Sequence, residues 1–385
     1  MQASATTWSP GTGWDDPGLF DLDAARTLVV AFGDARLRDF SEPLDQLREA
    51  FTRSSLLGCS TAGQISGDTL SDATVSVAVA HFDDVDLRTA AAPVTTSADS
   101  VVAGRRIASE LLDGGLRHVF VLSDGVLVNG SELVRGLTEV LPDDVAVTGG
   151  LAGDGERFGE TWILDENGLE PGLVRAVGLY GDALCVGYGS LGGWDIFGPE
   201  RLITRAEGNV LFEIDGRPAL SLYKEYLGDK ASGLPATALL FPLAIRPERG
   251  GDQVVRTVLG VDEATDSMRF AGDVPAGWTA QLMMANFDRL VDGALAAAGS
   301  AAEMATRHTR PAAAPGDTLA LAISCVGRRL VLGERTEEEL EATLGVLPDG
   351  TVLAGFYSYG EIAPQAGGTC DLHNQTMTLT TLGEK

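Results

Sequence analysis

Two short segments near the C-terminus of this 385-residue chain combine residue types that can do chemistry. Residues 355–364 bring together aromatics, glycines and a single glutamate, and residues 372–376 add a histidine and an asparagine. The apolar run 352–356 predicts a buried strand, so Glu361 and His373 are polar groups in apolar surroundings. Apolar walls with a few placed polar groups are typical of a ligand pocket. Glu361 and His373 could instead act as acid and base, or Glu361 could cap a helix while His373 is a satisfied core residue.

Further candidates lie on strands predicted elsewhere in the chain. Cys325 and Arg328, at the end of the apolar run 319–325, could place a thiolate beside a cation, which lowers the pKa of a cysteine. Cysteine is also among the residues most often simply buried, so nucleophilic catalysis by Cys325 with His373 is only an alternative. Arg256 lies inside an apolar run, where an unpaired charge is costly, so it is expected to face solvent or meet a carboxylate.

Two loops rich in small residues could also present backbone groups to a ligand. Residues 149–155 resemble a phosphate loop, but no helix follows the glycines and no GK[ST] sequence is present. A tight strand crossover or a glycine-lined pocket edge is therefore expected there. Residues 58–63 include Cys59 and Ser60, and they either offer N–H and hydroxyl groups to a compact ligand or form a packed strand end.

Composition excludes several classes of function. A formal net charge of −27 and a pI near 4.4 argue against nucleic-acid binding and against docking on anionic lipid. The first sixteen residues show no secretory signal, and the longest apolar run, 236–245, is too short to insert into a membrane. The four cysteines form no CxxC pair, and no two histidines have a metal-ligand spacing, so reduced thiols, no metal and a cytoplasmic location are expected.

The elements that must position these residues alternate between strands and helices. Strands are expected near residues 28–32, 118–122 and 319–325, with a hairpin over 201–214. Helices are expected near 101–112, from Asn129 through 140, and from 287 towards His308. Antiparallel runs such as 73–82 interrupt the alternation. The length exceeds that of one ordinary core, so a two-part α/β module with mixed sheets packed together and helices outside is predicted.

The order of the motifs resembles that of the FIST family, a two-part sensory module. Residues 58–63, 123–125 and 148–154 look like landmarks of its N-terminal domain, and residues 194, 204–209 and 213–219 resemble its closing part. Residues 226–228, 241–243, 270–277, 324–328, 355–361 and 373–376 resemble its C-terminal domain. The resemblance implies a polar segment at 1–25, an N-terminal domain at 26–221 and a C-terminal domain at 222–385.

The resemblance also implies a function. It predicts a sensor, not an enzyme, that binds an amino acid or similar metabolite and acts on a separate histidine kinase or cyclic-dinucleotide enzyme. Arg256 or Arg328 would pair with a ligand carboxylate and Glu361 with an amine, and the expected ligand-binding residues are Cys59, Ser60, Arg256, Cys325, Arg328, Tyr357, Glu361, His373 and Asn374. No cofactor is predicted. The alternatives are haem-based nitric-oxide sensing, with an axial ligand among His81, His118, His308 and preferably His373, and an enzyme using Cys325 or the Glu361/His373 pair.

Overall fold

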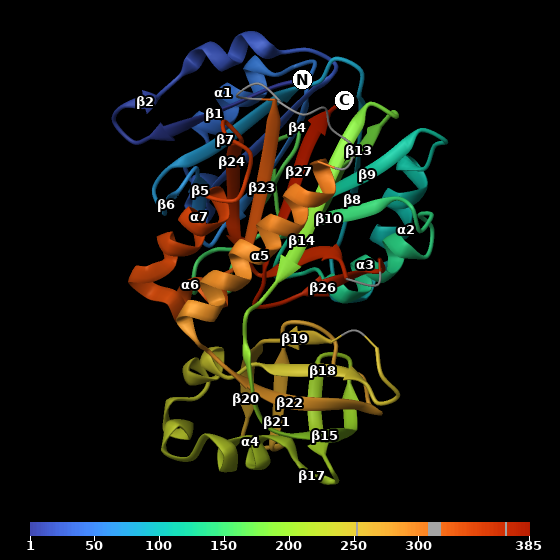
Figure 1. Cartoon of the computed structure of the whole chain (residues 1–385), viewed down its shortest axis with the longest axis vertical. Coiled ribbons are helices and arrows are strands. Elements are labelled where there is room, and N and C mark those ends of the chain that lie inside the picture. Colours follow the sequence, from blue (N-terminus) through green and yellow to red (C-terminus); the bar gives the residue numbers. More distant parts are fainter. Residues whose placement is uncertain (252, 307–316, 366–367) are drawn as a thin grey trace.

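The body of the protein consists of three units built on one plan (Figure 1). The computed structural model describes residues 1–385 except 252, 307–316 and 366–367. Each unit has two parallel strands joined by a helical segment, an antiparallel strand beside the first of them, and another antiparallel strand at the edge. Parallel neighbours require such a crossover, and a helix is its usual form.

The first unit lies in residues 1–81, with its strands in the order β4, β3, β7, β1. β3 is buried along its length up to Asp34, because both faces of this sheet are covered. The elements are β1 (Gln2–Ser9), β2 (Gly13–Trp14), β3 (Thr27–Asp34), α1 (Glu42–Ala50), β4 (Ser55–Thr61), β5 (Gln64–Ser66), β6 (Thr69–Ser71) and β7 (Val75–His81).

The second unit repeats this order as β10, β9, β13, β8. Asn129 starts its second helix as predicted, since the side-chain oxygen accepts a hydrogen bond from the backbone N–H of Glu132 at 3.2 Å. The elements are β8 (Asp86–Pro93), α2 (Ser100–Leu111), β9 (Leu116–Ser123), α3 (Gly130–Thr138), β10 (Ala146–Leu151), β11 (Ile163–Leu164), β12 (Leu169–Glu170) and β13 (Leu173–Tyr180).

The third unit has the order β24, β23, β27, β14, with α5 packed on β14. The helix expected from residue 287 is α5, and the predicted end at His308 lies outside the described residues. The elements are β14 (Leu184–Leu191), α5 (Phe287–Thr306), β23 (Thr318–Cys325), α6 (Val326–Leu332), α7 (Thr336–Leu344), β24 (Val352–Ser358), β25 (Gly360–Pro364), β26 (Cys370–His373) and β27 (Met377–Glu384).

Residues 195–284 are an insertion between β14 and α5 of the third unit. They form a sheet with its own apolar core and lie below the body in Figure 1. The hairpin expected at 201–214 is present, since Glu207 pairs with Val210. The elements are β15 (Asp195–Glu207), β16 (Val210–Ile214), β17 (Arg217–Pro218), α4 (Ala219–Leu227), β18 (Leu243–Pro247), β19 (Val254–Arg256), β20 (Val258–Asp262), β21 (Ser267–Phe270) and β22 (Trp278–Met284).

The three units are joined by an exchange of short tail strands. After its second parallel strand, each unit sends a strand to another unit: β5 pairs with β24, β11 pairs with β4, and β25 pairs with β10. The turn before each exchange has the sequence Ala62–Gln64, Ala152–Asp154 or Tyr359–Glu361, a glycine followed by a buried polar residue. The exchange is cyclic, so no unit completes its sheet alone.

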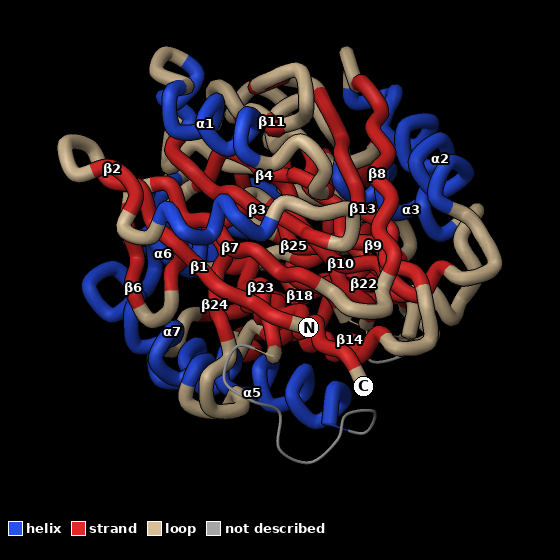
Figure 2. Tube along the Cα trace, turned by 90° about the horizontal axis from the view of Figure 1, so that it is seen from above, coloured by secondary structure: helices blue, strands red, loops and turns tan. Residues whose placement is uncertain are grey.

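The sheets meet in a shared core, with the helices outside. Phe32 of the first unit stacks on Phe356 of the third, with ring centroids 4.9 Å apart, and Phe120 of the second unit belongs to the same apolar cluster. Viewed from above, the strands fill the interior and the helices lie around it (Figure 2). The predicted mixed-sheet α/β class is confirmed. Sheets contain strands from both sides of residue 221, and the predicted domain boundary stays a prediction.

A glycine at the centre of β24 tests this close packing of strands. A Cβ at Gly355 would lie 1.8 Å from the carbonyl oxygen of Ala322 on β23. We expect Gly355→Ala to lower the free energy of unfolding by about 1–3 kcal/mol, measured by urea denaturation, because the strands would have to separate. Gly299→Ala on α5, where a Cβ meets nothing within 4 Å, is the control and should be neutral or slightly stabilising. Equal changes in the free energy of unfolding for the two variants would contradict the close packing of β23 and β24.

Candidate ligand-binding site

Arg328 of α6 is fully buried and binds four other chain segments. Its Nη2 lies 2.6 Å from Oε2 of Glu339, and it also donates to the carbonyl oxygens of Gly192, Leu290 and Gln375. A buried guanidinium is tolerated only when it is compensated in this way. The guanidinium therefore lies in the interior, and the predicted ligand contact of Arg328 stays a prediction.

Glu339 is the centre of the same network. It accepts hydrogen bonds from the hydroxyls of Ser324 at 3.1 Å and Tyr357 at 2.6 Å, in addition to Arg328. Tyr357 is fully buried, so its hydroxyl serves the network and lines none of the cavities described below. The sequence did not single out Glu339, because it lies in a run of glutamates typical of an exposed helix.

Glu361 is buried beside this network. Its Oε1 accepts from Ser358 at 2.7 Å, and its Oε2 accepts from the backbone N–H and hydroxyl of Thr376 at 3.2 and 2.9 Å. Burial raises the pKa of Glu361 to about 8, against the lowering effect of these hydrogen bonds. The side chain is therefore mostly neutral at pH 7, which is unfavourable for binding an amine.

The two candidate cysteines are both buried. Burial raises the pKa of the thiols of Cys59 and Cys325, so neither is a thiolate at neutral pH. Cys59 packs in the shared core, and the hydroxyl of Ser60 accepts a hydrogen bond from the backbone N–H of Trp162 at 3.0 Å. These contacts give no support to nucleophilic catalysis.

Arg256 connects the insertion to the third unit. It is buried, and its guanidinium donates to the carbonyl oxygens of Asp273 and Leu372, both at 2.9 Å, with Asp371 at 3.9 Å. It thus meets a carboxylate, as expected for a buried arginine, but that carboxylate belongs to the protein. The contact fixes β19 of the insertion against β26.

His373 lies at a cavity between the insertion and the third unit. This cavity of about 470 Å³, here called the junction cavity, is lined among others by Trp194, Val254, Met283, Arg289, His373 and Thr376. Burial lowers the pKa of His373, so the ring is neutral, and its Nε2 lies 3.0 Å from the carbonyl oxygen of Ala363. His373 and Glu361 occupy opposite positions of the β25–β26 pair but bond to different partners.

The histidines offer little to a haem. Nε2 of His373 is bonded to Ala363, which does not fit an axial role for that nitrogen. His118 is fully buried, with its Nε2 3.0 Å from the hydroxyl of Thr148, and Nδ1 of His81 lies 2.9 Å from Thr27. His308 lies outside the described residues. No group of three or more His, Cys, Asp or Glu that could hold a metal ion occurs among the residues that the structure describes.

Two buried amides next to His373 have polar atoms without a hydrogen-bond partner. Nδ2 of Asn374 donates to the carbonyl oxygen of His373 at 3.0 Å, but its Oδ1 has no partner. Both polar side-chain atoms of Gln375 are also without partners, and this amide lies against Gly327, where a Cβ would be 2.5 Å from Nε2. Buried groups of this kind usually bond to ordered water or a ligand.

A second cavity receives residues from all three units. This cavity of about 590 Å³, here called the three-unit cavity, opens where the parallel strands β3 and β4 end and α6 begins, the edge at which α/β sheets bind ligands. Its lining residues are Asp34, Arg36, Thr61, Ala62, Leu70 and Asp72 of the first unit, Gly155, Glu156 and Arg157 of the second, and Val326, Arg329, Leu330 and Gly333 of the third.

Charge dominates the three-unit cavity. Arg329 is anchored by the carbonyl oxygen of Ala62 and binds both carboxylate oxygens of Asp72 at 2.6 Å. Arg36 binds both carboxylate oxygens of Asp34 at 2.9 Å. Hydrogen bonding to Asp72 raises the pKa of Arg329, and hydrogen bonds from Arg36 lower the pKa of Asp34 although burial opposes them. The cavity thus offers arginines and carboxylates side by side.

The predicted residues Cys59, Ser60 and Arg328 are sequence neighbours of residues that line the three-unit cavity. Thr61 and Ala62 follow Cys59 and Ser60 in the sequence, and Arg329 follows Arg328. Successive residues of a strand or helix point in different directions, so Thr61, Ala62 and Arg329 face the cavity while the predicted residues beside them do not. Arg157 follows the loop 149–155, where a pocket edge is one of the two expectations, and Asp72 follows the motif 58–63. No local pattern shows that either side chain faces the cavity.

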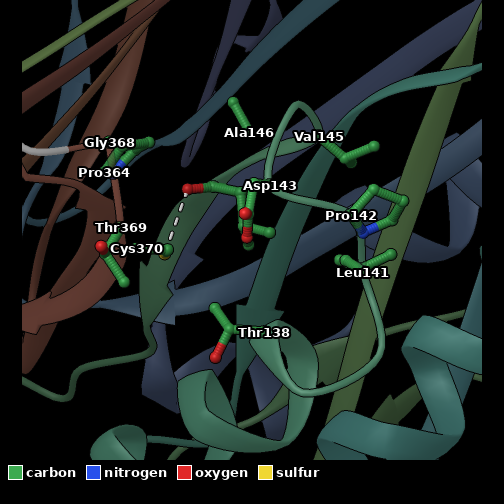
Figure 3. Close-up of a pocket in the computed structure, with 11 residues that line it drawn as sticks. Thr138, Leu141, Pro142, Asp143, Val145, Ala146, Pro364, Gly368, Thr369 and Cys370 are labelled. Carbon is green, nitrogen blue, oxygen red and sulfur yellow. Dashed lines mark hydrogen bonds between the residues drawn. The ribbon is translucent and has the colours of Figure 1, made fainter.

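A third cavity lies between the second and third units (Figure 3). It measures about 240 Å³. Its lining residues, from the end of α3 to the start of β10 and from the segment around β25 and β26, are Thr138, Leu141, Pro142, Asp143, Val145, Ala146, Val147, Pro364, Gly368, Thr369 and Cys370. The thiol of Cys370 donates to the carbonyl oxygen of Val147 at 3.4 Å, and burial raises its pKa. A neutral, bonded thiol gives this cavity no evident chemistry.

Comparison with known proteins identifies two matching family models and several relatives. The FIST N domain matches residues 27–217 and the FIST C domain matches residues 219–364. An uncharacterized protein of Mycobacterium bovis is 30% identical over 249 residues, which cover 61% of this chain and 59% of that protein. Another, of Mycobacterium tuberculosis, is 30% identical over 301 residues, covering 74% of this chain and 72% of that protein.

A likeness to one solved structure is weaker. The crystal structure of a cyanuric acid hydrolase from A. caulinodans covers 100% of this chain and 99% of its own, with a TM-score of 0.38 and 10% identity, which carries no argument. Within the described part of the chain, no helix is both long and apolar enough to cross a membrane.

The buried ion pair predicts a large cost for removing its cation. Arg328→Met should lower the free energy of unfolding by about 3–5 kcal/mol in a denaturant titration, because Glu339 would stay buried without compensation. Arg335, which pairs with Asp288 and Glu338 at the surface, provides the control. Arg335→Met should cost no more than about 1 kcal/mol. A similar small cost for both would contradict the role assigned to Arg328.

The pKa of Glu361 predicts a specific pH dependence of stability. The folded value of about 8 lies above the ordinary 4.5, so the folded protein holds this proton more tightly than the unfolded chain. The stabilisation is complete below about pH 4.5 and is lost as the pH rises through about 8. Glu361→Gln lacks this proton-linked stabilisation, which the wild type loses as the pH rises. The free energy of unfolding of the variant minus that of the wild type should therefore increase between about pH 5 and pH 8. A pH-independent difference would rule out the buried neutral carboxyl.

Proposed function

The chain belongs to the FIST family, and we propose that it is a sensor that binds a small zwitterionic metabolite, such as an amino acid, in the three-unit cavity. FIST domains are in general sensory domains of signal transduction. The observation that carries the proposal is the charge of this cavity, in which three arginines and three carboxylates come from three units.

The charges of the cavity fit a zwitterion. Arg329 is held in place by the carbonyl oxygen of Ala62, so a ligand carboxylate can bind its planar fork without first ordering the side chain. Asp72 now occupies that fork, and its side chain is 60% exposed, so it can be displaced into solvent. Asp34 and Glu156 supply the acceptors for a ligand amine.

Helix α6 provides a route from the cavity to the rest of the molecule. Arg329 lines the three-unit cavity, and the adjacent Arg328 binds the carbonyl oxygen of Gly192, where the chain enters the insertion. A ligand acts only through its preference for one of two arrangements. Movement of α6 would therefore change the position of the insertion, which would be the surface read by a partner.

The proposed partner is a separate cytoplasmic signalling protein, such as a histidine kinase or a cyclic-dinucleotide enzyme, and the chain itself is not an enzyme. The geometry supports this view through the buried, neutral state of Cys325 and Glu361. Haem sensing receives no specific support from the contacts of His373.

Two opposite effects of substitution test the proposal. A thermal-shift screen of the twenty amino acids identifies a ligand, and calorimetry then measures its affinity. Arg329→Gln should weaken binding by about 1.5–3 kcal/mol, because a charge-assisted bond is lost. Asp72→Asn should strengthen binding, because the ligand carboxylate no longer competes with the Asp72 carboxylate for Arg329.

Arg205→Gln serves as the control, since Arg205 pairs with Glu213 at the surface of the insertion. Its affinity should equal that of the wild type. If no amino acid binds saturably, or if Arg329→Gln and Asp72→Asn leave the affinity unchanged, the proposal is wrong.

A further inference from the structure

The junction cavity differs in charge from the rest of the protein. The chain carries 55 acidic residues and a net charge of −27, yet none of the described residues that line this cavity is Asp or Glu. Its charged side chain is Arg289, and the neighbouring His373 is neutral. Asp195 binds Arg289 and Asp371 binds Gln365, but both carboxylates lie outside the lining.

Arg289 keeps free hydrogen-bonding capacity at the cavity. A guanidinium has five N–H donors, and the contact with Asp195 uses Nη1. The lining also has an apolar part, since Trp194 and Met283 belong to one apolar cluster and Val255 packs against it. The indole N–H of Trp194 is already bonded to the carbonyl oxygen of Gln375 at 2.8 Å, so its ring offers only an apolar surface.

The cavity also lies where the insertion is attached. The chain leaves the third unit through Gly192–Trp194 and returns through residues 285–286 before Arg289, so both connections border the cavity. The connection is tightly built: Gly193 has φ +76°, and a Cβ there would lie 1.8 Å from the carbonyl oxygen of Arg289. A molecule bound here contacts both the insertion and the third unit.

We infer that the junction cavity is a second binding site, for a small organic anion with one carboxylate and an apolar body. The carboxylate binds Arg289, and the apolar part packs on Trp194, Val255 and Met283. A cavity of about 470 Å³ is within the range of sites for small organic ligands. Because the occupant touches two parts of the chain, its binding favours one position of the insertion over others. This site shares no lining residue with the three-unit cavity.

The experiment titrates the full chain with acetate, hexanoate, phenylacetate and indole-3-acetate by calorimetry, each paired with its neutral amide. At least one carboxylate with an apolar body should bind saturably, and its amide should bind at least about tenfold more weakly. Arg289→Gln should weaken carboxylate binding by about tenfold to a hundredfold and remove the preference over the amide.

Three further variants make the outcome decisive. Val255→Trp fills the cavity while leaving Arg289 in place, and it should also abolish binding. Arg246→Gln, which breaks a surface pair with Glu200, should bind like the wild type. Arg329→Gln should keep its affinity for the carboxylate, because Arg329 lines the other cavity.

The inference is overturned if none of the four carboxylates binds saturably, or if Arg289→Gln and Val255→Trp bind as the wild type does. Binding that is lost in Arg329→Gln and retained in Arg289→Gln would assign the probe to the three-unit cavity. That result would overturn the second site while supporting the proposed function.

Discussion

The compensation of one buried guanidinium organises the part of the protein on which its function depends. Arg328 is fully buried, and Glu339 together with the carbonyl oxygens of Gly192, Leu290 and Gln375 satisfies it. These partners lie on α7, on the entrance to the insertion, on α5 and on the turn before β27. Loss of these contacts would leave the charge of Arg328 buried without compensation, so the chain segments that provide them are held in one arrangement.

The cyclic exchange of tail strands explains why the sites lie between units. Each unit borrows a strand from another, so the ends of parallel strands from different units meet at the glycine turns. Backbone and carboxylate groups at these turns are satisfied within the protein, as for Glu361 and for Asp154, which accepts from the backbone N–H groups of Gly159 and Glu160. The cavities therefore open beside the motifs, where side chains from separate units remain available.

The sequence is sufficient to predict the α/β class and the buried strand 352–356, because apolar runs and helix caps are local signals. It is not sufficient to show that Arg328 faces the interior while Arg329 faces a cavity. It also does not show that Asp72 meets Arg329, because that contact depends on the pairing of β5 with β24. The three-unit plan is also hidden, because Ala62–Gln64, Ala152–Asp154 and Tyr359–Glu361 share only a glycine and a polar residue. Arg256 is buried and bonded within the protein, which no local pattern reveals, and its predicted ligand contact stays a prediction.

The central claim is that one ligand contacts all three units at the three-unit cavity. Hydrogen–deuterium exchange with and without the amino acid that stabilises the protein most tests it directly. The account predicts slower exchange in three separate segments, around residues 61–72, 155–157 and 326–333, with a smaller change near Gly192 at the entrance to the insertion. Protection confined to one unit, or found only within the insertion, would contradict it.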